Sequence, residues 1–292
     1  MKPKILVVGG GGVGGYVAAK LSQNYDVTLY SKSMQSLYVV ENGTQKKYNV
    51  RIINEPPKER FDIIIFAVKS HVLQAYAKEL QVCAEEHTLI YPLLNGIEPY
   101  EKLKKLFSNS KVLKGAIYII SNKIAPNTIE LKGKGAMIVT DNEKIREIFE
   151  KSGIKVKYTQ EIDKEIWKKY LFIAATAALT SLYGKTFGAV AKEHLGEFED
   201  LLEEIIRIAK SEGVQLSEEE KHKAIELLKK SPPNAKTSLQ LDLEQGNLGE
   251  IDNILGYLAK KSPKFAQIVS TIAAAKVSAE TPSSPSSSST AF

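Results

Sequence analysis

The fold is decided by the first segment of the chain, which reads KILVVGGGGVGG over residues 4–15. The short apolar run Lys4–Val8 predicts a buried strand, and the residues that follow the glycines, Tyr16 to Leu21, predict a helix. A strand, a glycine-rich turn and a helix in direct succession are typical of a dinucleotide-binding site. A glycine run alone could be a flexible loop or a merely structural turn, so the flanking strand and helix carry this interpretation.

The glycines of this loop have distinct expected roles. Gly9 permits the tight turn, Gly11 lets the backbone approach a pyrophosphate, and Gly14 lets the helix and the strand pack closely. The exposed N–H groups at the start of the helix would then bind the phosphates. We therefore predict that the cofactor contacts Gly9, Gly11, Gly12, Val13 and Gly14.

The type of nicotinamide cofactor depends on the end of the second expected strand, Asp26–Tyr30. Enzymes that use NAD usually place an acidic residue there, whereas a cation suits the 2′-phosphate of NADP. This chain has Ser31-Lys32-Ser33 at that place, with no carboxylate. We predict NADP(H), with Ser31 and Lys32 as contacts; the alternative is that Lys32 is an ordinary solvated lysine.

The pattern of apolar runs predicts an α/β fold, with a Rossmann-type nucleotide-binding domain followed by an all-helical domain. We assign residues 1–160 to the first domain, 161–277 to the helical substrate domain, and 278–292 to a Ser/Pro-rich tail that should be disordered. The expected strands are Lys4–Val8, Asp26–Tyr30, Asp62–Ala67, Thr88–Tyr91, Lys111–Ile120 and Ala136–Val139. The expected helices are Gly14–Ser22, His71–Cys83, Ile97–Lys105, Glu143–Ser152, Lys164–Leu182, Phe198–Glu212, one that opens at Ser217, Thr237–Gln245 and Glu250–Lys261.

Composition narrows the class of protein. A net charge of +6 could indicate nucleic-acid binding, but lysines and glutamates are mixed along the helices, so we expect a small anionic ligand and no nucleic acid. The apolar stretch Tyr170–Tyr183 is too short to span a bilayer, and we expect no membrane contact. The single cysteine, Cys83, excludes an internal disulfide and a multi-thiolate metal site, so we expect no metal and a cytoplasmic location.

Several further stretches together resemble one family, 2-dehydropantoate 2-reductase, also called ketopantoate reductase. The resemblance covers the chain except its tail and includes the glycine loop, Ala67-Val68-Lys69 and Leu94-Asn95-Gly96. In the helical half it includes Ile166-Trp167-Lys168-Lys169, Leu179–Leu182, Ser238–Asp242, Gly246, Glu250-Ile251-Asp252, Ile254 and Gly256. The spaced Ser, Asp, Gly, Glu-Ile-Asp and Gly of the second half are more specific than the glycine loop.

The resemblance implies the roles of individual residues. It makes Lys169 the general acid and places Glu250 and Ser238 against the substrate. It also places Asn95 and Lys69 at the active site, where both contact the substrate and the cofactor. An ammonium such as that of Lys169 can stabilise the negative charge that builds on a carbonyl oxygen and can supply the proton. A carboxylate such as that of Glu250 can orient the lysine, and Lys69 adds positive potential for an anionic acid.

Other readings of these residues stay open. A lysine at a helix start is usually solvated, Glu250 could be a first-turn glutamate, and Ser238 could cap a helix. Asn95 before Gly96 could be simple turn chemistry.

The sequence also departs from the family pattern. The family carries asparagines four and eight residues after its catalytic lysine, where this chain has Ile173 and Ala177, and Gly249 replaces the usual threonine. Helical periodicity places Ile173 and Thr176 on the face of Lys169, so that face offers apolar surface and a hydroxyl, and we include Thr176 among the substrate contacts. These departures bear on the substrate and leave the redox residues in place.

Three functions therefore compete. The first is NADPH-dependent reduction of ketopantoate to pantoate, in pantothenate and coenzyme A biosynthesis. The second is reduction of another 2-oxo acid by a paralogue, and the third is a non-catalytic NADPH-binding sensor. The helical domain could also form a homodimer, although its apolar faces are equally explained by its own core.

Overall fold

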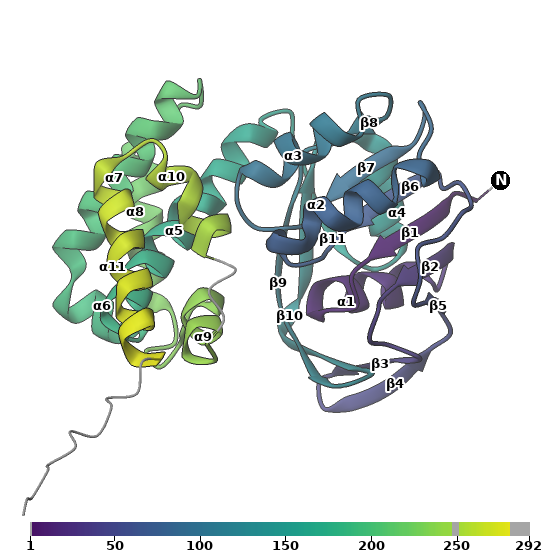
Figure 1. Cartoon of the computed structure of the whole chain (residues 1–292), viewed down its shortest axis with the longest axis horizontal. Coiled ribbons are helices and arrows are strands. Elements are labelled where there is room, and N and C mark those ends of the chain that lie inside the picture. The colour runs from purple at the N-terminus through teal and green to yellow at the C-terminus, as the bar shows by residue number, and fades with distance from the viewer. Residues whose placement is uncertain (1, 247–250, 281–292) are drawn as a thin grey trace, which may run out of the picture. The chain divides into compact units, whose positions relative to one another are not determined.

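A computed structural model describes residues 2–246 and 251–280 of the 292-residue chain (Figure 1). The chain divides into two compact units. The first contains the residues up to Tyr170 together with Ala209–Leu216, and the second contains Leu171–Ile208 and the residues from Ser217 onward. The first unit is α/β and the described elements of the second are helices, as the sequence predicts.

A six-stranded parallel sheet forms the centre of the first unit, in the order β5-β2-β1-β6-β7-β8. Its strands are β1 (Lys4–Val8), β2 (Asp26–Tyr30), β5 (Arg51–Ile53), β6 (Ile63–Phe66), β7 (Leu89–Pro92) and β8 (Lys111–Val112). Ile5 and Val7 of β1 point into one apolar cluster, while Leu6 and Val8 point into another. Burial on both faces explains why these strands are continuous apolar runs.

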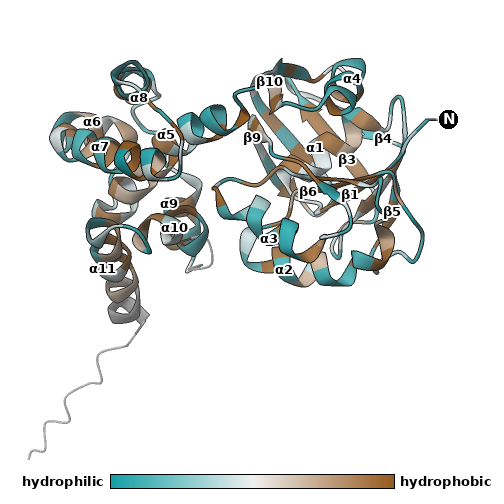
Figure 2. Cartoon of the chain, turned by 90° about the horizontal axis from the view of Figure 1, so that it is seen from above, coloured by the Kyte–Doolittle hydropathy of each residue, from teal (hydrophilic) through white to brown (hydrophobic). Residues whose placement is uncertain are grey.

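Helices cover both faces of this sheet. On one side lies α1 (Gly12–Leu21), and on the other lie α2 (Ser70–Glu79) and α3 (Glu98–Leu106). Figure 2 shows both hydrophilic and hydrophobic colours on α2 and α3, as expected for helices with one buried face. Leu73 of α2 and Leu103 of α3 supply that buried face.

A second, mixed sheet packs on the other side of α1. It has the order β11-β10-β3-β4, with β9 paired to β10, and its strands are β3 (Leu37–Glu41), β4 (Thr44–Tyr48), β9 (Ala116–Ala125), β10 (Thr128–Thr140) and β11 (Lys155–Tyr158). The helix α4 (Glu143–Lys151) joins β10 to β11, and α1 packs against β9, β10 and β3. The glycine-loop helix is therefore held between two sheets.

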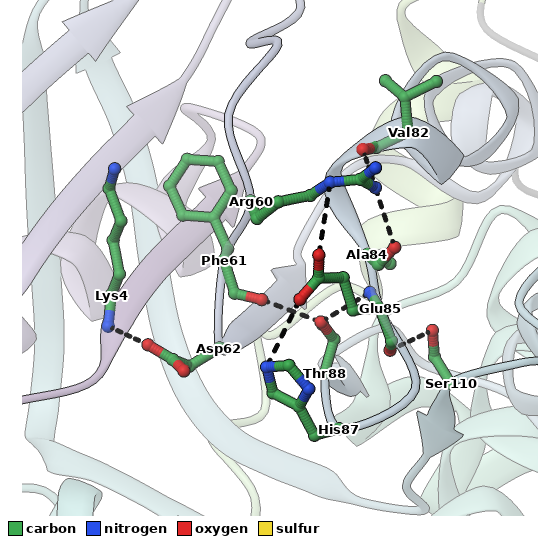
Figure 3. A network of polar contacts seen from close by, with 10 residues as sticks. All are labelled: Lys4, Arg60, Phe61, Asp62, Val82, Ala84, Glu85, His87, Thr88 and Ser110. Atoms are coloured by element: carbon green, nitrogen blue, oxygen red, sulfur yellow. Dashed lines mark hydrogen bonds and ion pairs between the residues drawn. The ribbon is translucent and has the colours of Figure 1, made fainter.

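A polar network joins the amino ends of the parallel strands (Figure 3). Asp62 accepts a hydrogen bond from the backbone N–H of Lys4 at 2.7 Å, and the Thr88 hydroxyl donates to the carbonyl of Phe61 at 2.8 Å. The Glu85 carboxylate pairs with Arg60 at 3.6 Å. These contacts occupy the edge of the sheet opposite to the one where the glycine loop begins.

The second unit is built from helices. They are α6 (Phe187–Glu193), α7 (Leu195–Ser211), α8 (Glu218–Lys230), α9 (Ser238–Glu244), α10 (Tyr257–Ala259) and α11 (Pro263–Glu280), and α5 (Ile162–Tyr183) leads from the first unit into it. The expected capping box of α8 is present, because the N–H of Ser217 donates to the Glu220 carboxylate at 2.7 Å. Among the described residues, no helix combines the length and the apolar character that a membrane span requires.

The predicted pattern differs from the structure in several places, and β5, α6 and α11 have no predicted counterpart. The strand expected at Lys111–Ile120 is two strands, β8 and β9. The second sheet contains antiparallel pairs, and its strands β3, β4 and β11 have no predicted counterpart. β4 carries no apolar pattern, because it is almost wholly polar and exposed. In place of one α-helix up to Lys261, residues Asp252–Gly256 form a π-helical turn. The tail was expected from residue 278, but α11 continues to Glu280; residues 281–292 lie outside the described part.

Candidate active site

The predicted site residues of the first unit follow the carboxyl ends of four neighbouring strands. Gly9 follows β1, Lys32 lies two residues after β2, Lys69 lies three residues after β6, and Asn95 lies three residues after β7. Carboxyl ends of parallel strands meet at one edge of a sheet, which is where open α/β sheets bind ligands. The topology therefore brings together four segments that are far apart in sequence.

The glycine loop is tightly packed except at one position. Gly9 has a φ of +110°, and a Cβ on Gly14 would lie 1.9 Å from the carbonyl oxygen of Gly9. A Cβ on Gly12 would lie 2.3 Å from the carbonyl oxygen of Ser121, in β9. A Cβ on Gly11, the residue before α1, would meet no atom within 4 Å. Gly11 thus faces open space at a helix N-terminus, while Gly10 is packed against the side chains of Ser31 and Met34 and Gly12 against the backbone of Ser121.

This arrangement fits the pyrophosphate of a dinucleotide. Gly11 leaves the approach to the start of α1 open, and the first turn of α1, which begins at Gly12 and Val13, contains no acidic residue. Unpaired N–H groups and the positive end of the helix dipole both favour an anion there. The chain therefore offers the predicted cofactor a cradle made of backbone.

Two lysines lie near the loop that follows β2. The side chain of Lys32 is exposed, lies over the Tyr76 ring at 4.8 Å from its centroid, and is 3.9 Å from Glu79. Lys123 of β9 donates to the Ser33 hydroxyl at 2.9 Å. Ser31 is only 3% exposed, with its hydroxyl against Gly10, so the outward groups of this loop are Lys32 and Ser33.

Lys169 lies in the part of α5 that belongs to the first unit. Its Nζ donates to Asn95 Oδ1 at 2.9 Å and to the carbonyl oxygen of Ile117 at 2.6 Å, and it lies 5.3 Å from the centroid of the Tyr118 ring. Among the described residues no third acceptor contacts Nζ. An ammonium has three N–H donors, so the third has no acceptor within the described part of the chain.

The surroundings of Lys169 change its acidity. Burial lowers the pKa of this lysine to about 8, because removal from water disfavours the charged form. Burial also raises the pKa of Tyr118 to about 12, so its phenol is neutral at physiological pH. A lysine that holds and releases a proton near neutral pH is suited to general acid catalysis.

The neighbouring Lys168 provides an internal contrast. Its Nζ contacts the Glu165 carboxylate at 3.0 Å, and Glu165 also pairs with Lys157 at 2.6 Å. Hydrogen bonds from these lysines hold the pKa of Glu165 below its usual value despite burial. Lys168 thus belongs to a structural ion-pair cluster, and Lys169 does not.

The strand β9 connects the glycine loop to Lys169. The Ser121 carbonyl lies against Gly12, and the Ile117 carbonyl accepts from Lys169. Four residue steps along a strand span about 13 Å. The same strand therefore contacts both the glycine loop and the catalytic lysine candidate. The sequence pattern did not predict this connection.

The sequence also predicts substrate contacts at Thr176, Ser238 and Lys69, and a catalytic role for Glu250. The Thr176 hydroxyl is buried and donates to the carbonyl of Phe172 at 2.6 Å, within α5. Ser238 is exposed at the first turn of α9, whose cap is Thr237, since Thr237 Oγ1 accepts from the Gln240 N–H at 3.2 Å. Lys69 is exposed at the start of α2. Glu250 lies outside the described residues.

Sequence reasoning missed three contributors, all in β9. These are the carbonyl of Ile117, the ring of Tyr118 and the ammonium of Lys123. A backbone carbonyl carries no side-chain signal, and the other two residues become neighbours of the site only through strand pairing. Within the described part of the chain, no group of three or more acidic, histidine or cysteine side chains is placed to hold a metal ion.

The fold and these contacts are those of a Rossmann-type dinucleotide-binding protein in which Lys169 is the candidate catalytic residue. Comparison with protein families gives the same class. Residues 5–144 match the family model "Ketopantoate reductase PanE/ApbA", and residues 161–274 match "Ketopantoate reductase PanE/ApbA C terminal". The chain therefore belongs to the ketopantoate reductase family, and it is an oxidoreductase of the kind that uses a nicotinamide cofactor.

Two curated relatives align with nearly the whole chain. An uncharacterised oxidoreductase of Bacillus subtilis, YkpB, is 30% identical over 282 residues, which cover 90% of this chain and 93% of YkpB. The 2-dehydropantoate 2-reductase of Lactococcus lactis is 24% identical over 289 residues, covering 90% and 92%.

Solved structures show the same fold at lower identity. A PanE/ApbA family ketopantoate reductase from Ralstonia eutropha has a TM-score of 0.84 at 22% identity, covering 95% of this chain and 100% of that one. D-mandelate dehydrogenase with NADH and anilino(oxo)acetate has a TM-score of 0.83 at 19% identity, covering 95% and 100%. A dimeric ketopantoate reductase from Staphylococcus aureus has a TM-score of 0.81 at 23% identity, covering 94% and 99%.

Proposed function

We propose that this protein reduces a 2-oxo acid to the 2-hydroxy acid with NADPH, and that ketopantoate, reduced to pantoate for pantothenate and coenzyme A biosynthesis, is the leading substrate. The observation that carries the proposal is the ammonium of Lys169, held at 2.9 Å from Asn95 Oδ1 and 2.6 Å from the Ile117 carbonyl. The family name and the reductase names of the relatives support the same reaction.

The residues of the chain divide the work as follows. The chemistry that a bound reduced nicotinamide supplies is a hydride for the carbonyl carbon of the acid. Lys169 donates a hydrogen bond to the carbonyl oxygen, stabilises the charge that builds there, and transfers its proton to that oxygen. Asn95 and Ile117 hold the ammonium in one position, so little reorganisation is needed at the moment of transfer.

Four further residues are assigned roles in positioning the lysine and the substrate. We assign Glu250 to orienting the lysine, and Ser238, Thr176 and Lys69 to binding the acid, as the family pattern implies. The hydroxyl of Thr176 would have to accept, because its hydrogen is donated within α5.

NADPH is favoured over NADH by the charges beside β2. A 2′-phosphate needs cations, and Lys32 and Lys123 both lie at the loop that contains Ser33. Glu79 opposes this preference only weakly, since its contact with Lys32 is 3.9 Å. Comparing the dissociation constants of NADPH and NADH tests the assignment, and tighter binding of NADH would contradict it.

Ile173 and Ala177 favour an alternative substrate, a 2-oxo acid other than ketopantoate. These residues replace the two asparagines that the family pattern places after the lysine, and Ala177 is fully buried. A lost hydrogen bond to a substrate hydroxyl costs roughly 1–3 kcal/mol. This loss favours a 2-oxo acid with a more apolar side chain, and the Bacillus relative has no assigned substrate that would decide otherwise.

Two further properties accompany the proposal. We propose a homodimer, on the analogy of the dimeric reductase from Staphylococcus aureus, which sedimentation of the purified protein would test. We also propose a cytoplasmic location. The single cysteine, Cys83, is a free thiol, and free thiols are typical of proteins in a reducing compartment.

One comparison of substrates tests the central proposal. NADPH consumption is followed with ketopantoate and with 3,3-dimethyl-2-oxobutanoate, which is the same acid without the hydroxyl. A higher kcat/KM for ketopantoate supports the leading substrate, whereas a higher value for the other acid supports the apolar alternative. A protein that binds NADPH and reduces neither acid, nor any other 2-oxo acid in a panel, would be the non-catalytic sensor.

A further inference from the structure

The ring of Tyr118 lies beside the amine of Lys169, and the proposed mechanism gives it no role. Its ring centroid lies 5.3 Å from Nζ, and the residue is 37% exposed. The carbonyl of the preceding residue, Ile117, accepts from the same amine at 2.6 Å. The backbone contact therefore fixes where the Tyr118 ring lies relative to the reacting proton.

The exposed face of β9 continues this apolar surface. Side chains alternate along a strand, so residues 118 and 120 share a face, and Ile120 is 64% exposed. The intervening Ile117 and Ile119 point into the core instead. Exposed apolar residues that gather beside a polar reactive group are typical of a ligand surface.

The distances bring the ring within reach of a substrate held by Lys169. A carbonyl oxygen that accepts from Nζ lies about 2.9 Å from it. The carbon atoms attached to that carbonyl are then about as far from Nζ as the Tyr118 ring is. Apolar groups pack when their atoms approach within about 4.5 Å, so the ring can contact the side chain of the acid.

We propose that Tyr118 is a substrate-specificity residue whose ring packs against the side chain of the 2-oxo acid and favours branched or aromatic apolar side chains over small ones. This inference rests on the proposed function, since it names the substrate class of the same site. It assigns the contact to the ring and not to the phenol hydroxyl. The neutral phenol adds no charge that would repel the carboxylate of the acid.

Substitutions at two matched tyrosines test the inference. Tyr118→Ala removes the ring, and Tyr118→Phe removes only the hydroxyl. Tyr158 is the control, because it is 39% exposed and carries a similar cation contact, with Arg146 at 5.0 Å from its ring. For each variant, kcat/KM with NADPH is measured for 3,3-dimethyl-2-oxobutanoate, phenylglyoxylate and pyruvate, and the ratios to pyruvate are compared.

The ratio removes general damage to the enzyme, which affects all three acids alike. We expect Tyr118→Ala to lower both ratios by about tenfold or more, the size of a lost apolar contact. Tyr118→Phe and Tyr158→Ala should keep the ratios of the unsubstituted protein.

Unchanged ratios in Tyr118→Ala would overturn the inference while leaving the proposed function intact. An equal fall in Tyr118→Phe would overturn it as well, because the hydroxyl would then be the determinant. If the unsubstituted protein reduces none of these acids and no ketopantoate, the proposed function fails first, and the inference falls with it.

Discussion

The glycine loop and the surroundings of Lys169 belong to the same compact unit but are built in different ways. The loop is a single segment, residues 9–14, whose geometry is enforced by backbone contacts such as that between Gly14 and the carbonyl of Gly9. The amine of Lys169 instead meets Asn95 from the end of β7 and Ile117 from β9. Binding the cofactor thus depends on local backbone shape, whereas proton transfer depends on side chains assembled from distant parts of the chain.

If this contrast is correct, removing the lysine should abolish chemistry and spare cofactor binding. We expect Lys169→Ala to lower kcat/KM by about 10²- to 10⁴-fold, because the proton donor is lost, with the dissociation constant of NADPH unchanged. The matched control is Lys168→Ala, whose amine contacts Glu165 and should keep activity within about threefold. Equal losses in both variants would show that the helix, not the Lys169 amine, is what matters.

Substitutions in the glycine loop should instead affect stability or cofactor binding. Gly14→Ala should lower the stability of the fold, whereas Gly11→Ala should weaken cofactor binding. Gly14→Ala places a Cβ 1.9 Å from the Gly9 carbonyl, so we expect a loss of about 1–3 kcal/mol or more in the free energy of unfolding, measured with urea. Gly11→Ala meets no atom within 4 Å and should unfold like the parent protein. It should nevertheless weaken NADPH binding by about tenfold or more, since the methyl group occupies the approach of the pyrophosphate. Equal stability of the two variants would contradict the packing described for this loop.

A smaller effect is expected from the two lysines beside β2, Lys32 and Lys123. Their removal tests which part of the glycine-loop region recognises the cofactor. Lys32→Ala and Lys123→Ala should each weaken NADPH binding by about tenfold, the typical effect of one charge-assisted hydrogen bond. NADH lacks the 2′-phosphate, so its binding should not change in either variant. A parallel loss for both cofactors would indicate that these lysines act on the fold of the loop.

The same contrast explains what could be predicted from the sequence. β1, β2 and the glycine loop are local patterns, so their bounds and the nucleotide-binding fold follow from a few neighbouring residues. The family resemblance brings Asn95 and Lys169 together, and the structure places them 2.9 Å apart. The carbonyl of Ile117 and the ring of Tyr118 could not be predicted, because a backbone carbonyl carries no side-chain signal and the ring reaches the site only through the pairing of β9 with β10. The polar, exposed strand β4 carries no apolar alternation, so the second sheet was also missed.

The most direct test of the Lys169 assignment is the pH dependence of kcat/KM for reduction. Burial lowers the pKa of this lysine to about 8, and only the protonated amine can act as the acid. Activity should therefore be constant below about pH 8 and fall by about tenfold per pH unit above it. In Asn95→Asp a carboxylate beside the amine should stabilise the ammonium and move this limb to higher pH. A profile that stays flat to about pH 10, or a limb that Asn95→Asp leaves in place, would contradict the assignment.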